Sequence, residues 1–194
     1  MLSYKKAIIN KCKEFNLRYI DKVFSDSENE DDIINFCNNV KADGFILLQP
    51  FLDKINLEIL RDKIKLRDLD CFTYKSLGRV MANEFQYLPQ TARSIVKFIE
   101  ENKIDLNGKN VIVANSNNVI GRPLSMYLNY KKATVTLFNS KSLNQEEKIK
   151  SCDIFISAIG KAKYYDRKFF TDNQLIIDVG INYKNGRVYG DIYI

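Results

Sequence analysis

A short apolar run that passes through a polar loop into a helix start is the feature that most constrains this fold. Residues 110–114 (NVIVA) are mostly apolar and β-branched, and the polar loop 115–120 leads to Gly121 and Pro123, which suit a first helical turn. Such a turn directs unpaired backbone N–H groups at one point, which is how α/β proteins hold phosphate. Gly121 is the only glycine in this stretch, so G-x-G-x-x-G is absent and an ordinary strand–helix turn stays an open alternative.

The same kind of pattern recurs along the second half of the chain. Strand-like segments at 134–138, 154–157 and 175–179 alternate with helical segments, and a strong helix is expected over 91–102. We therefore predict an α/β fold. It consists of a doubly wound, Rossmann-like parallel sheet in residues 91–194 and a reduced α/β lobe in residues 1–90.

The first lobe has weaker patterns. The elements expected there are, in chain order, a helix over 3–15, a strand over 18–24, a helix from a capping box at Ser27 and Glu30 through Val40, a buried strand over 45–48 closed by Pro50, a weaker helix over 56–65 and a long irregular connector over 66–90.

The amino-acid composition limits which residue types can take part in catalysis or bind a ligand. The 194 residues include no histidine, so any proton transfer falls to Lys, Asp, Glu, Tyr, Cys or water. The four scattered cysteines form no C-x-x-C pair, which predicts reduced thiols and no metal site. The net charge of +6 suits an anionic partner such as a nucleotide, but no arginine-rich stripe indicates nucleic acid. Neither a membrane-length apolar run nor a signal peptide is present, so we expect a cytoplasmic protein without membrane contact.

Six short segments in the second half resemble one family in order and spacing. That family is the bifunctional methylenetetrahydrofolate dehydrogenase/methenyltetrahydrofolate cyclohydrolases of one-carbon metabolism, which carry V-G-x-P, A-T-V-T, H-S-x-T, A-x-G-x-P, I-D-V-G-I-N and V-G-D-V. The resemblance implies NADP or NAD as cofactor, a tetrahydrofolate derivative as substrate and a homodimer. The matching segments here are 119–124, 133–136, 139–142, 157–161, 177–182 and Gly190-Asp191.

The resemblance places two catalytic residues in the first lobe, Tyr4 and Asp70. The family lysine that handles the proton stands four residues after the tyrosine, and that position is Ile8 here. An isoleucine cannot carry a proton. Among the nearby lysines, Lys11 leaves the helix in the direction closest to that of the missing lysine.

Two further departures concern the same site. The family glutamine corresponds to Leu48, with Gln49 one residue late and therefore on the other face of a strand. The family also opens with a strand and a glycine loop before Tyr4 and continues past Asp191 into a closing helix. We therefore expect a chain truncated at both ends, with degenerate active-site motifs.

The second lobe holds the cofactor positions that the resemblance implies. The family G-R-S corresponds to Asn115–Asn117, so Ser116 replaces an arginine that contacts the 2′-phosphate. Lys141 is a candidate substitute, and a relaxed preference for NAD is the alternative. The implied cofactor-binding residues are Thr91, Asn115, Ser116, Asn117, Gly121, Ser140, Lys141, Gly180 and Ile181.

Several functions stay open. The favoured one is a degenerate family member whose cyclohydrolase chemistry is lost, because several substitutions fall in the same active site. One alternative is an NAD(P)-dependent methylenetetrahydrofolate dehydrogenase that retains hydride transfer. The others are a non-catalytic remnant, a pseudoenzyme that dimerises or binds a nucleotide weakly or not at all, and full bifunctional activity through a displaced lysine.

Overall fold

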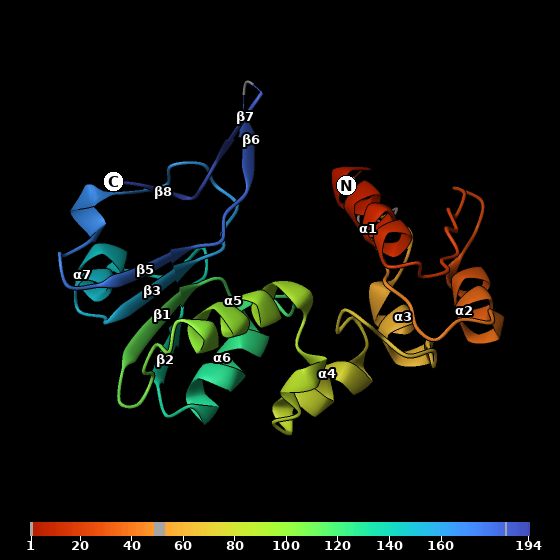
Figure 1. Ribbon diagram of the computed structural model, residues 1–194, viewed down its shortest axis with the longest axis horizontal. Helices are drawn as coiled ribbons and strands as arrows, with labels where there is room; N and C mark the ends of the chain where they lie inside the picture. Colours follow the sequence, from red (N-terminus) through yellow and green to blue (C-terminus); the bar gives the residue numbers. More distant parts are fainter. Residues whose placement is uncertain (1, 49–52, 185) are drawn as a thin grey trace. The chain divides into compact units, whose positions relative to one another are not determined.

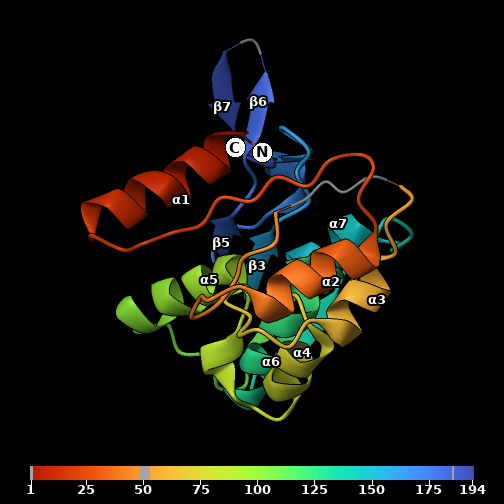
Figure 2. The ribbon, with the colours of Figure 1, turned by 90° about the vertical axis from the view of Figure 1, so that its right-hand side faces the viewer.

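The chain forms two compact units, Met1–Lys75 and Ser76–Ile194. The computed structural model describes residues 2–48, 53–184 and 186–194 (Figures 1 and 2). The boundary expected at 90/91 separates proposed roles rather than compact units, and it stays a prediction.

A parallel sheet forms the centre of the second unit. Its strands are β1 (Asn110–Ala114), β2 (Thr134–Leu137), β3 (Ile154–Ser157) and β5 (Leu175–Asp178), in the order β2-β1-β3-β5. All three pairings are parallel: Val111 pairs with Val135 of β2 and Ile154 of β3, and Ile154 pairs with Leu175 of β5. The predicted doubly wound parallel sheet is therefore confirmed.

Helices cover both faces of this sheet (Figure 1). α5 (Gln90–Glu101) packs on α6 (Gly121–Tyr130), which contacts β1 and β2. On the opposite face, Ile112 of β1 shares a core cluster with Ile149 of α7 (Gln145–Lys150). Side chains of a strand alternate between faces, so a strand that is buried throughout, as β3 is, needs helices on both sides.

Aromatic side chains fill the core on the α7 side. Phe155 of β3 is completely buried, and its ring centroid lies 4.9 Å from that of Tyr165 and 5.5 Å from that of Phe170. Tyr165 belongs to the short strand β4 (Tyr165–Asp166), and the single turn η2 (Arg167–Phe169) leads to Phe170. The segment after β3 thus closes this side of the core.

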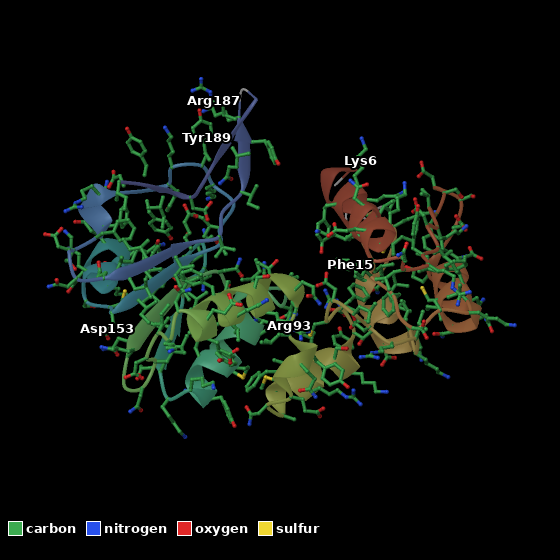
Figure 3. All side chains as sticks on the ribbon, viewed as in Figure 1. Lys6, Phe15, Arg93, Asp153, Arg187 and Tyr189 are labelled. Atoms are coloured by element: carbon green, nitrogen blue, oxygen red, sulfur yellow. The ribbon has the colours of Figure 1, made fainter. Side chains whose placement is uncertain are left out.

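Three short strands near the C-terminus had no counterpart in the predictions. β8 (Ile192–Tyr193) pairs with β4, while β6 (Asn182–Lys184) and β7 (Arg187–Tyr189) form an antiparallel hairpin. The hairpin projects from the sheet, and Figure 3 labels Arg187 and Tyr189 on it. Strands of two or three residues are too short to show an alternating pattern.

The expectation of an irregular connector over 66–90 was wrong. α4 (Tyr74–Met81) and the turn η1 (Phe85–Tyr87) lie in it. The buried residues of α4 are Ser76 and Val80, so one of its two core positions is polar. Gly78, a poor helix former, weakens the pattern further.

Among its described residues, the first unit contains the helices α1 (Leu2–Glu14), α2 (Glu30–Asn39) and α3 (Leu57–Lys63). In its described part, the only strand-type pairing is one parallel bridge between Phe45 and Asp68. The described part of this lobe is therefore mostly helical. Its core holds Ile33, Cys37, Ile55, Leu60, Ile64 and Phe72.

Two predictions for this unit were wrong. Residues 18–24 form no strand, since nothing in the described part of the unit pairs with them. The segment 45–48 is half-buried rather than buried, and Gln49 and Pro50 lie outside the described residues.

The expected capping box at Ser27 and Glu30 also shifts along the chain. Asn29 caps α2 instead, because its side chain accepts the N–H of Asp32 at 3.1 Å while its own N–H binds the Asp32 carboxylate at 2.9 Å. Two overlapping cap patterns stand in this sequence, and the local backbone selects one.

Replacing Phe155 by alanine should reveal how far the second unit depends on its aromatic core. We expect Phe155→Ala to lower the free energy of unfolding by about 3–5 kcal/mol, since it removes a fully buried ring and leaves a cavity. The matched control is Phe98→Ala on α5, where 46% of the residue is exposed. Urea unfolding followed by circular dichroism measures both, and equal losses would contradict the role of Phe155.

Candidate functional site

The carboxyl ends of the parallel strands bring most of the predicted cofactor residues to one edge of the sheet. Asn115–Asn117 follow β1, Ser140 and Lys141 follow β2, and Gly180 and Ile181 follow β5. Asp153, labelled in Figure 3, precedes β3 and marks the opposite edge. Ligands of doubly wound sheets bind at the carboxyl edge.

The loop after β1 is held by its own amide side chains. Asn115 Oδ1 accepts the N–H of Asn117 at 3.0 Å and that of Gly121 at 3.1 Å. Asn117 Oδ1 accepts the N–H groups of Val119 and Ile120 at 3.0 and 2.8 Å. A Cβ atom on Gly121 would lie 2.0 Å from the Asn115 carbonyl oxygen, so the close approach of α6 to β1 requires glycine there.

The loop after β2 presents a hydroxyl and an ammonium group. The side chain of Asn139 accepts the N–H of Lys141 at 2.8 Å, which orders the turn. Ser140 and Lys141 are both exposed, so their polar groups are accessible at the carboxyl edge. A cation and a hydroxyl at this position fit the phosphate of a nucleotide.

A buried carboxylate joins the loop after β3 to the C-terminal segment. Asp191 is completely buried, and its carboxylate accepts hydrogen bonds from two other segments. Burial alone would raise the pKa of Asp191, but these hydrogen bonds outweigh it and hold the pKa below its usual value. The donors are Ser157 Oγ (2.9 Å), the N–H groups of Ile159 (2.8 Å), Gly160 (3.3 Å) and Lys161 (2.8 Å), and Asn182 Nδ2 (3.0 Å).

Close packing against this carboxylate explains why a glycine stands at position 180, one of the predicted site residues. A Cβ atom on Gly180 would lie 2.2 Å from the Asp191 carboxylate, so only glycine fits there. Ile181, next in the chain, is 70% exposed and stands beside the carboxyl edge as an apolar surface. Asp191 itself was absent from the predicted site residues, although it belongs to the Gly190-Asp191 segment of the resemblance.

Thr91 occupies the first turn of α5 and is half-buried. Its role in cofactor binding stays a prediction.

In the first unit, Tyr4 and Asp70 lie close enough to interact electrostatically. Partial burial raises the pKa of the Tyr4 phenol, and the negative charge of Asp70 raises it further. Tyr4 therefore keeps its proton at neutral pH. The two residues lie within electrostatic range of each other, and their roles stay predictions.

The position of the family lysine faces an open hollow of about 310 Å³ along α1. Lys11 is the only ionisable ammonium among its lining residues, and its Nζ binds Glu14 at 2.7 Å and lies 5.6 Å from the ring centroid of Phe15, labelled in Figure 3. Leu48 is half-buried. The lining consists of Tyr4, Ala7, Ile8, Lys11, Cys12, Phe15 and Leu17.

The cysteines take no part in a metal centre within the described residues, where no group of three potential ligands occurs. Burial, with smaller effects of nearby carboxylates, raises the pKa of Cys71 to about 12 and that of Cys152 to about 11. These thiols are protonated at neutral pH and unreactive. In the same described part, every helix falls short of the length and apolarity that crossing a bilayer demands.

Known proteins share this arrangement. Residues 89–194 match the profile of the tetrahydrofolate dehydrogenase/cyclohydrolase NAD(P)-binding domain. The chain belongs to the tetrahydrofolate dehydrogenase/cyclohydrolase family. The bifunctional protein FolD of Clostridium botulinum (strain Okra) is 31% identical over 198 residues, which cover 98% of this chain and 70% of FolD.

Solved structures of the family share the fold. The bifunctional FolD of Campylobacter jejuni superposes with a TM-score of 0.90 at 24% identity, and the Trypanosoma brucei FolD, complexed with NADP and an inhibitor, with 0.87 at 20%. In both cases the match covers 98% of this chain and 70% of the other. Within this family, Ile8, Leu48 and Ser116 depart from the motifs that the resemblance supplies, and the roles of the individual residues stay predictions.

Neutralising Asp191 should destabilise the carboxyl edge in a pH-dependent way. We expect Asp191→Asn to lower the free energy of unfolding at pH 7 by about 3 kcal/mol, because buried N–H donors lose a charged acceptor. The folded-state pKa is depressed, so this stability is present above the unfolded pKa of about 3.9 and is lost as pH falls through the folded pKa.

The difference between wild type and Asp191→Asn should therefore shrink towards acid pH in urea titrations. Asp172→Asn, which changes a carboxylate whose side chain is 83% exposed, serves as the control and should change little. A difference that is independent of pH would contradict this account.

Proposed function

We propose that this family member binds a nicotinamide dinucleotide at the carboxyl edge of its sheet and has lost cyclohydrolase activity. The matched NAD(P)-binding profile supports the first part. The loops after β1, β2 and β5 offer the hydroxyls of Ser116 and Ser140, the ammonium of Lys141 and the apolar surface of Ile181. These groups fit the phosphates and the nicotinamide of such a cofactor.

The observation that carries the loss of cyclohydrolase activity is the side chain at position 8. Water attack on a methenyl carbon needs a group that takes up and returns a proton, a contribution of about 10²–10⁴ in rate. Ile8 has no such group, and the hollow that it lines is apolar apart from Lys11, the Cys12 thiol and the Tyr4 hydroxyl. Tyr4 holds its proton too tightly to act as a base at neutral pH.

A second candidate function is hydride transfer, as in an NAD(P)-dependent methylenetetrahydrofolate dehydrogenase. Hydride transfer depends on positioning more than on a proton carrier, and the cofactor supplies the hydride acceptor when bound. The proximity of Tyr4 and Asp70 favours this candidate, since both offer hydrogen bonds to a folate ring. A tetrahydrofolate derivative is therefore the proposed substrate. We also propose a cytoplasmic homodimer.

The purified protein should show no cyclohydrolase activity above the uncatalysed rate. The measurement follows the disappearance of methenyltetrahydrofolate against a sample without enzyme, and Lys11→Ala is assayed in parallel. Turnover that collapses in Lys11→Ala would show that Lys11 replaces the family lysine, and would overturn the proposed loss. Lys13→Ala, on the same helix but outside the lining of the hollow, is the matched control.

Cofactor choice should depend on the loops after β1 and β2. We expect Lys141→Ala to weaken NADP binding about tenfold and leave NAD unchanged, since an ammonium group contacts only the additional 2′-phosphate. Ser116→Arg should strengthen NADP binding by a similar factor, because a guanidinium binds phosphate with two hydrogen bonds. Isothermal titration measures both, with Lys148→Ala on α7 as control. Binding of neither cofactor by the wild type would refute the proposed cofactor site.

A further inference from the structure

The order of the strands places a topological switch point between β1 and β3. From β1 the chain passes through α6 to β2 on one side, and from β2 it passes through α7 to β3 on the other side. The carboxyl ends of β1 and β3 are therefore the place where doubly wound sheets bind their ligands. The side chain of Asn115 lies at this place.

Asn115 links three parts of the fold with one amide. Its Nδ2 donates to the carbonyl oxygen of Ala158, just beyond β3, at 2.7 Å. Its Oδ1 accepts the N–H of Asn117 and that of Gly121, where α6 begins, at 3.0 and 3.1 Å. The side chain thus spans the switch point and occupies backbone donors that a phosphate at this turn would use.

We propose that Asn115 is a latch on the cofactor site, which competes with the pyrophosphate of a nicotinamide dinucleotide for the N–H groups of Gly121 and Asn117. This inference rests on the proposed cofactor binding. A phosphate oxygen is a stronger hydrogen-bond acceptor than a neutral amide, so the cofactor displaces the Asn115 side chain. Breaking the hydrogen bonds of that side chain costs free energy, which lowers the observed affinity for the cofactor.

The latch opens by rotation of a side chain, without unfolding of the loop. The backbone of Asn115 packs so closely against Gly121 that a Cβ atom on Gly121 would not fit, and this contact holds the backbone in place. The cap that Asn117 provides for Val119 and Ile120 uses a different acceptor, Asn117 Oδ1, and keeps the start of α6 in place. Removal of the Asn115 amide therefore frees two donors in a preserved turn.

Titration calorimetry of NADP and NAD with two variants tests the latch. We expect Asn115→Ala to bind both cofactors about tenfold more tightly than the wild type, because no side chain has to leave. Asn115→Asp should bind both more weakly, since a carboxylate holds the same N–H groups more firmly and repels the pyrophosphate. Asn129→Ala removes a similar amide-to-carbonyl bond, to Ala133, at the far end of α6 and should leave affinity unchanged.

The outcomes separate the latch from the proposed function. Wild-type binding with equal or weaker binding by Asn115→Ala would overturn the latch and leave the cofactor site standing. Binding by Asn115→Ala alone would support the latch and refute cofactor binding by the native chain, while binding by neither overturns both.

A second measurement uses the wild-type protein and therefore tests the latch even if a variant fails to fold. In ¹⁵N-labelled wild type, saturation with NADP should shift the side-chain amide resonance of Asn115 away from its hydrogen-bonded position, and an unmoved resonance in the complex would overturn the latch.

Discussion

The parallel pairing of β1 with β2 on one side and β3 on the other is the constraint on which the second unit depends. It requires crossover helices on both faces, and it gathers the loops after each strand at one edge. Residues far apart in sequence, such as Ser116, Lys141 and Ile181, meet at this edge for that reason alone. The composition of each loop then determines which ligand the common fold accepts.

Side chains of the protein accept hydrogen bonds from many of the backbone N–H groups at this edge. Asp191 gathers the N–H groups of the loop after β3, and Asn115 and Asn117 gather those of the loop after β1. The two cases differ in consequence. Asp191 is completely buried and charged, so its removal leaves donors without an acceptor, whereas Asn115 is partly exposed and a ligand can replace its amide. One interaction stabilises the edge and the other regulates access to it.

The first unit carries the substitution on which the proposed loss of cyclohydrolase activity rests. Tyr4 lies within electrostatic range of Asp70, and Ile8, which the resemblance places at the position of the family lysine, lines a largely apolar hollow. Proton transfer requires a titratable group at one position, whereas binding and hydride transfer are shared among several contacts. Loss of one chemistry with retention of a cofactor site is therefore physically consistent, and the paired assays distinguish the two.

The sequence by itself determined the parallel sheet and its flanking helices, because the strands at 110–114 and 154–157 are apolar on both faces and carry a strong local signal. It also indicated the family through short segments in register. Only the tertiary structure decided that residues 18–24 form no strand with any described segment, that Asn29 caps α2, and that Asp191 and Asn115 hold loops from other strands. Those outcomes depend on partners distant in sequence, whose proximity no local pattern encodes.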